Sequence, residues 1–122
     1  MTDPPAPRPE SAIRADITDA LAAVWIRYAG KRPTAVRTQI RDNVVTCVLV
    51  DAVSDHDASL AASETSNAVA GASRLNSAAY KSDAAAIVTD LTGRRMTSFI
   101  SSHDPETDVA TETFTLERRF FS

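Results

Sequence analysis

Hydrophobic residues recur at three- and four-residue intervals near the start of the chain, which is the spacing of one helical face. This pattern predicts a helix over residues 11–28. Ser11 is a residue type that caps helix starts, and Gly30 stands where a left-handed C-terminal residue is needed. The predicted buried stripe contains Ile13, Ile17, Leu21, Val24 and Tyr28.

The spacing then changes to two, which predicts a β-hairpin. Residues 35–41 alternate apolar and polar positions, and residues 44–51 are rich in β-branched side chains. Asp42 and Asn43 tolerate positive φ and fit a two-residue turn. That turn predicts a register with Ile40 opposite Val45, Thr38 opposite Cys47 and Val36 opposite Leu49. Arg37, Gln39 and Arg41 then share the other face.

Helical and β patterns each return once more along the chain. Residues 55–63, 66–80 and 82–92 are predicted as helices, with Ser82 as a cap and Gly93 as a terminator. Residues 95–101 and 109–117 are predicted as a second hairpin around the polar loop 102–108. Phe114 and Leu116 should face the core, and Thr111, Thr113 and Thr115 should face outward. Alternation places Glu112 on the core face with Phe114 and Leu116. Three explanations for a charged residue there stay open: a position at the sheet margin, a neighbouring β-bulge, or pairing with an arginine.

The element order α-β-β-α-α-β-β predicts an α+β fold. Its economical packing is a two-layer sandwich, in which helices cover one face of a four-stranded, mostly antiparallel sheet made of two β-hairpins. Residues 1–10 hold four prolines and are interpreted as a disordered tail. Residues 11–122 are interpreted as a single domain.

Composition narrows the function classes. The net charge is −3, which argues against a protein whose main role is to coat nucleic acid. The single cysteine, Cys47, allows no internal disulfide and favours a cytoplasmic setting. Its mid-strand position predicts a buried, inert thiol. No apolar run approaches the ~18–20 residues that cross a bilayer.

Several segments together resemble the bacterial MpsC-like family, which is named for a Na⁺-translocating, membrane-potential-generating system. They are YAGKRPT at 28–34, LTGRR at 91–95, FISS at 99–102 and DVATETF at 108–114. The resemblance covers about residues 13–117. It implies an accessory to membrane transport, with a membrane-associated transport subunit as a partner, and it supplies no catalytic residues.

Basic residues form one candidate binding zone for an anion, RNA or an acidic partner. Arg37 and Arg41 share a sheet face by two-residue periodicity. Lys31, Arg32, Arg94 and Arg95 are candidates to extend the zone. The alternative interpretation is an ordinary charged surface.

Histidine and aspartate form the second candidate cluster. His56 and Asp57 follow the first hairpin, and His103 and Asp104 lie in the second hairpin loop. If strands two and three run the same way, these residues share one end of the sheet, where a metal-dependent or acid–base site is conceivable. The alternative is a set of solvated polar residues.

Aromatic residues give the third candidate, an oligomer contact. Phe120 and Phe121 follow two arginines at the end of the chain. Trp25 lies beside the main helical stripe, so it either widens the buried face or marks a partner contact. The sequence as a whole favours a non-catalytic binding or assembly module, a homodimer that needs no cofactor. The alternatives are anion or nucleic-acid binding through Arg37 and Arg41, and a His/Asp metal site.

Overall fold

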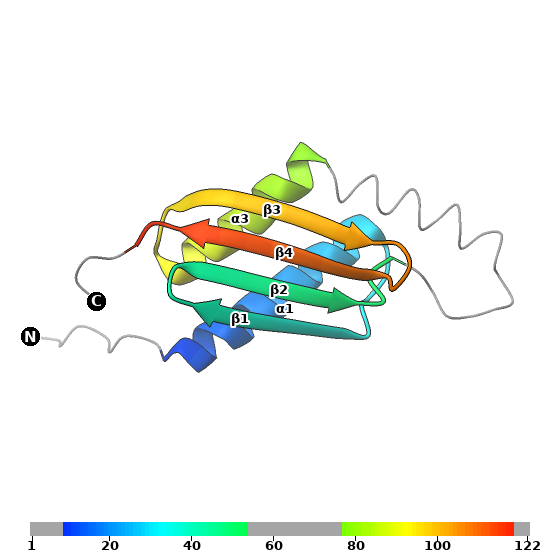
Figure 1. Cartoon of the computed structure of the whole chain (residues 1–122), viewed down its shortest axis with the longest axis horizontal. Coiled ribbons are helices and arrows are strands. Elements are labelled where there is room, and N and C mark those ends of the chain that lie inside the picture. The colour runs from blue at the N-terminus through cyan, green and yellow to red at the C-terminus, as the bar shows by residue number, and fades with distance from the viewer. Residues whose placement is uncertain (1–8, 54–76, 119–122) are drawn as a thin grey trace, which may run out of the picture.

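In the part of the chain that the structure describes, four antiparallel strands form a sheet, and two helices lie on one side of it (Figure 1). The computed structural model describes residues 9–53 and 77–118. Its elements are α1 (Glu10–Ala29), β1 (Ala35–Arg41), β2 (Val44–Val50), α3 (Ala78–Thr92), β3 (Met96–Asp104) and β4 (Val109–Leu116). The predicted α+β sandwich is confirmed. The predicted helix 55–63, nearly all of helix 66–80 and most of the predicted tail lie outside the described residues.

Helix α1 begins one residue earlier than predicted. Pro9 is the N-cap, with no side-chain capping bond, and its carbonyl accepts the Ala12 and Ile13 N–H groups at 3.0 and 3.2 Å. Ser11 is therefore not the cap. Gly30 ends the helix at φ 78° as predicted, where a Cβ would be strained.

The buried row of α1 differs from the predicted stripe in its second half. Its members are spaced by four residues throughout, and Val24 and Tyr28 pack only at the margin. The row follows the line along which α1 crosses the sheet. It contains Ile17, Leu21, Trp25 and Ala29.

The first hairpin has the predicted register throughout. Ile40 pairs with Val45, and Thr38 pairs with Cys47. Asp42 takes φ 56° in the turn. Asn43 then donates its side-chain amide to the Leu116 carbonyl at 3.0 Å, so the turn also holds the end of β4.

Helix α3 is continuous through the point where a break was predicted. Ser77, not Ser82, is the N-cap, and its hydroxyl accepts the Tyr80 N–H at 3.2 Å. Ser82 is exposed and inside the helix, where a serine that points to solvent costs little. Tyr80, Ala84 and Val88 are buried, and Gly93 ends the helix at φ 66° as predicted.

The sheet order is β1-β2-β4-β3, so β4 lies between β2 and β3 and pairs with both. Strands β2 and β3 are therefore parallel to one another, and their C-terminal ends lie at the same end of the sheet. Strand β3 extends to Asp104, three residues beyond the prediction, because the Asp108 N–H closes the loop on the Asp104 carbonyl at 2.8 Å. The loop predicted at residues 102–108 is therefore limited to residues 105–108 in the structure. A register shift separates Met96 from Ser98.

Candidate functional site

The outer face of the sheet is covered by neither of the described helices. Figure 1 looks onto this face, and both described helices lie behind it. Strand pairing arranges its residues in rows that run across β1, β2, β4 and β3. The rows are Ala35–Val50–Val109–Asp104, Arg37–Val48–Thr111–Ser102, Gln39–Thr46–Thr113–Ile100 and Arg41–Val44–Thr115–Ser98.

Each strand contributes one column of side chains to this outer face. The two central columns, which come from β2 and β4, contain only valine and threonine. All of them are partly exposed, and the three threonines predicted to face outward do so. The flanking columns come from β1 and β3 and consist of charged residues, glutamine and serine, with two exceptions. These are Ala35 and Ile100, and the Ile100 side chain is 61% exposed. The outer face is thus a β-branched centre between a column with two arginines and a column that ends in one aspartate.

The six candidate basic residues do not lie together on one surface. Arg37 and Arg41 are exposed on the outer face, and Arg41 borders a shallow depression with Gln39, Val44 and Thr46. Lys31 and Arg32 precede β1, at the opposite end of that strand from Arg41. The extended basic zone is therefore not continuous.

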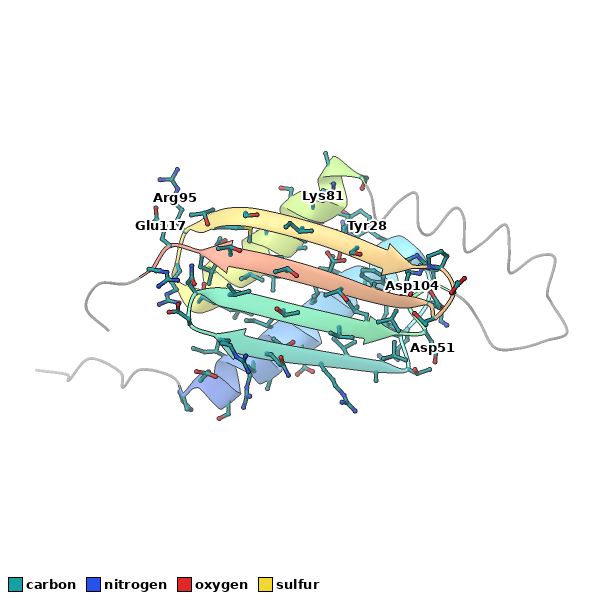
Figure 2. The ribbon with its side chains drawn as sticks, in the orientation of Figure 1. Tyr28, Asp51, Lys81, Arg95, Asp104 and Glu117 are labelled. Carbon is teal, nitrogen blue, oxygen red and sulfur yellow. The ribbon has the colours of Figure 1, made fainter. Side chains whose placement is uncertain are left out.

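Arg94 and Arg95 lie beyond the outer face, at one end of the sheet. Arg94 Nη1 donates to the Asp42 carbonyl at 3.3 Å. Arg95 lies 3.7 Å from Glu117, and Figure 2 shows this pair at the end of the sheet opposite Asp51 and Asp104. Both side chains are exposed, so the ion pair contributes little to stability.

The candidate His/Asp cluster forms different pairs from those expected. His103 Nε2 lies 2.8 Å from Asp108 Oδ1, whereas Asp104 accepts the Glu106 N–H at 2.9 Å and shapes the loop. His56 and Asp57 lie outside the described residues. Within residues 9–53 and 77–118, no group of three histidine, cysteine or acidic side chains is placed to hold a metal ion.

Asp108, which sequence reasoning did not single out, organises this end of the sheet. Both its carboxylate oxygens accept the Val53 N–H, at 3.1 and 3.2 Å, and its carbonyl accepts the Ala52 N–H at 3.0 Å. It takes φ 54°, which aspartate tolerates better than most residues. That tolerance, together with the turn-rich DPETD segment, is the sequence signal that could have identified it. We call this set of contacts the Asp108 clasp.

Three of the large, fully buried side chains among the described residues are ionisable: Glu112, Tyr80 and Cys47. Glu112 is the only carboxylic acid of the three. It lies on the inner face of β4 at 0% exposure, opposite Cys47 of β2 and Ser101 of β3. Ser101 Oγ donates to Glu112 Oε1 at 2.7 Å. Of the positions considered from the sequence, the core face is correct. The hydrogen-bond partner of Glu112 is a serine and not an arginine, and the register shift lies near the start of β3, between Met96 and Ser98.

Cys47 is buried and free, as its mid-strand position predicts. Its Sγ lies 3.4 Å from Thr38 Oγ1. Burial raises the pKa of the thiol to about 11, so at neutral pH it is protonated and a poor nucleophile.

Trp25 lies in the core of the chain. Its side chain is 2% exposed, its ring packs edge-on against Tyr80 at 5.7 Å, and Nε1 donates to the Ala52 carbonyl at 2.7 Å. This burial agrees with the interpretation in which Trp25 widens the buried face of the helix. Phe120 and Phe121 lie outside the described residues.

These features define a class of protein: a small two-layer α+β sandwich with a β-branched outer face and a carboxyl group buried under its helices. A family model described as MpsC, Na⁺-translocating membrane potential-generating system, matches residues 10–118. The chain therefore belongs to the MpsC family, and the resemblance noted in its sequence is confirmed. Comparison with curated proteins and with solved structures found no match. In the described parts of the chain, no helix is both long and apolar enough to cross a membrane.

Proposed function

We propose that this protein is a non-catalytic, cytoplasmic assembly module, accessory to a membrane-potential-generating system, and that it dimerises through the outer face of its sheet. The observation that carries the proposal is the absence of charged residues from the two central columns of the outer face. A strand whose two faces are both covered reads as a nearly continuous apolar run, whereas a solvated face alternates with polar residues. Strand β2 reads VVTCVLV and carries no charge on either face.

The face is a better docking surface than the edges of the sheet. Both edge strands carry features that oppose pairing with another strand. Strand β1 presents Arg37 and Arg41, and β3 has a register shift between Met96 and Ser98. A partner that approaches in the plane of the sheet meets these obstacles, whereas a partner that stacks on the face does not.

A second copy of the chain suits this face when the two-fold axis runs parallel to the strands. Sheets stacked face to face keep their strands within about 30° of one another. With this axis, β1 of one copy lies over β3 of the other, which brings Arg37 within one row of Asp104. An axis across the strands stacks β1 on β1 and gathers four arginines, which is unfavourable.

The size of the face predicts a weak dimer. Four strands about 4.8 Å apart, with seven residues of about 3.3 Å each, give a projected area of roughly 450 Å². A standard stable interface buries about 800 Å² per partner. The dimer should therefore depend on protein concentration, which suits a module whose assembly is completed on a membrane-associated transport subunit.

Sedimentation equilibrium of the purified chain over a wide concentration range tests the dimer. The wild type should show a concentration-dependent rise in mass. Thr113→Lys, at the centre of the face, should remain monomeric. Ala23→Lys, on the exposed side of α1, is the matched control and should behave as wild type. A wild type that stays monomeric throughout overturns the proposal, as does equal behaviour of the two lysine variants.

Charge exchange tests the orientation. Arg37→Asp and Asp104→Arg should each weaken the dimer by roughly threefold to tenfold, and the double exchange should restore most of the affinity. Additive weakening in the double variant would exclude the axis parallel to the strands.

The accessory role is tested by co-expression with the transport subunits of the system. The chain should enter the membrane fraction only when they are present, and Thr113→Lys should reduce that recruitment. Recovery in the membrane fraction without any of those subunits would contradict the accessory role.

Anion binding is a second candidate function, favoured by the depression beside Arg41. Binding of a short RNA or of inorganic phosphate there should weaken steeply with added salt and be lost in Arg37→Gln/Arg41→Gln. Absence of binding at low salt would remove this candidate. The His/Asp metal site receives no comparable support, because His103 and Asp104 bond to different partners.

A further inference from the structure

An unsatisfied pair of polar groups lies in the core between α3 and the sheet. Glu112 comes from β4 and Tyr80 from the first turn of α3, and both side chains are 0% exposed. Glu112 Oε1 is satisfied by Ser101. Glu112 Oε2 and the Tyr80 hydroxyl are buried, and among residues 9–53 and 77–118 neither atom meets the geometry of a hydrogen bond with any partner. An orphaned carboxylate oxygen in the core is costly, so this arrangement calls for a physical explanation.

Protonation of Glu112 supplies that explanation. A neutral carboxyl carries no charge to desolvate, and its hydroxyl becomes a donor. Burial raises the pKa of Glu112 to about 7, against the opposing influences of the Ser101 hydrogen bond, Tyr80 and Lys81. Burial also raises the pKa of Tyr80, with further contributions from the charge of Glu112 and from a side-chain interaction with it, so the two groups are close neighbours although their geometry falls short of a regular hydrogen bond.

Each element packed around Glu112 contributes an identifiable group. Strand β2 contributes Cys47, and β3 contributes Ser101. Helix α3 contributes Tyr80 and, on its exposed side, Lys81, which is the cation that acts on Glu112. Helix α1 contributes the rings of Trp25 and Tyr28, which pack edge-on against Tyr80 at 5.7 and 5.5 Å. No arginine or lysine ion pair with Glu112 is present among the described residues, so a proton is the natural neutralising partner.

We propose that Glu112 and Tyr80 form an internal proton-binding site that couples pH to the seating of α3 on the sheet. With the proton bound, the carboxyl is neutral and α3 packs flat over β4. When the proton leaves, a bare carboxylate faces the Tyr80 ring and the inner face of the sheet. Its charge can be hydrated only if the first turn of α3 lifts. The inference is independent of the dimer, because Glu112 lies on the opposite face of β4 from Thr111 and Thr113.

The direction of the pH effect follows from the raised pKa. The ordinary glutamate value is 4.5, and the value in the folded protein is about 7, so the folded state holds the proton more tightly than the unfolded chain. Stability contributed by this group is complete below about pH 4.5, falls as the pH rises through the interval, and is lost above about pH 7. This is the reverse of the usual salt-bridged carboxylate.

Thermal unfolding of the wild type and Glu112→Gln from about pH 4.5 to about pH 8.5 tests the site. Glutamine keeps the acceptor oxygen for Ser101 and cannot ionise. The two Tm values should nearly coincide at the acid end and diverge by roughly 10 °C at the basic end, with the glutamine variant more stable. Glu117→Gln, which alters an exposed carboxylate just beyond the end of β4, should show no such divergence. A pH-independent difference between Glu112→Gln and the wild type overturns the proposal.

Trp25 provides a direct readout in the folded state, because it is the only tryptophan in the chain and its ring contacts Tyr80. Its fluorescence should titrate with a midpoint near pH 7 in the wild type and not in Glu112→Gln. Histidines ordinarily titrate in the same range, so the transition must persist in His56→Gln/His103→Gln. Loss of the transition in that double variant overturns the assignment to Glu112.

A measurement on the unaltered protein keeps the proposal falsifiable if Glu112→Gln does not fold. The side-chain carboxyl carbon of Glu112, followed by NMR, should titrate near pH 7. A midpoint close to the ordinary glutamate value would remove the proton-binding site while leaving the dimer proposal intact.

Discussion

The two faces of one sheet follow opposite rules in this protein. The inner face buries large side chains under α1 and α3, and at its centre it also buries a carboxyl group. The outer face has valine and threonine in its central columns, and its charges lie at the margins. Alternation therefore fixes which side chains share a face, but it does not make the inner face uniformly apolar or the outer face uniformly polar. The polarity of each face depends on what packs against it.

The largest test of this contrast uses neighbours on β4. Phe114 is fully buried and stacks on Phe99 at 4.5 Å, so Phe114→Ala should cost about 3–5 kcal/mol of unfolding free energy. Thr113→Ala, one residue away on the outer face, should cost less than about 1 kcal/mol in the monomer. Chemical denaturation at low protein concentration measures both. Similar losses would mean that the outer face is packed within the monomer.

The Asp108 clasp allows a second comparison, between a buried and an exposed aspartate of one loop. Asp108→Ala removes the acceptor of the Val53 N–H and the partner of His103, and should cost about 2 kcal/mol. Asp104→Ala removes one exposed bond to the Glu106 N–H and should cost less than about 0.5 kcal/mol. Urea unfolding distinguishes the two. A larger loss in Asp104→Ala would contradict the central role of Asp108.

Local patterns were enough to predict much of the fold. The turn at Asp42 and Asn43 fixed the register of β1 and β2, because a two-residue turn leaves one pairing that puts the apolar sides together. Gly30 and Gly93 were recognisable as helix terminators, because few other residues accept a positive φ. These features depend on interactions within a few residues, which the sequence displays directly.

The candidate site could be predicted only in part, because its key contacts are long-range. Tyr80 and Glu112 lie on separate elements, and only the packing of α3 over β4 makes them neighbours. Likewise, Trp25 reaches the Ala52 carbonyl across the space between α1 and the end of β2. The alternation of β4 did place Glu112 on the inner face. It could not show that Ser101 of β3 would be the hydrogen-bond partner of Glu112, or that none of the described arginines and lysines would form an ion pair with it.

The smallest expected effect compares two aromatic hydrogen bonds of α1. Trp25→Phe keeps the edge-on contact with Tyr80 but loses the bond from Nε1 to the buried Ala52 carbonyl. The unfolding free energy should fall by about 1–2 kcal/mol, because a buried acceptor is left unsatisfied. Tyr28→Phe loses a bond of 2.6 Å to Asp83, but that carboxylate is 41% exposed and water can replace the donor.

The Tyr28→Phe loss should therefore stay below about 0.5 kcal/mol, although its hydrogen bond is the shorter of the two. Matched denaturation curves in the two phenylalanine variants measure the difference. Burial of the orphaned acceptor, and not the length of the hydrogen bond, should set the order. A greater loss in Tyr28→Phe would instead show that the link between α1 and α3 at Asp83 matters more than the inner-face contact at Ala52. The helices would then hold one another in place more strongly than the sheet holds them.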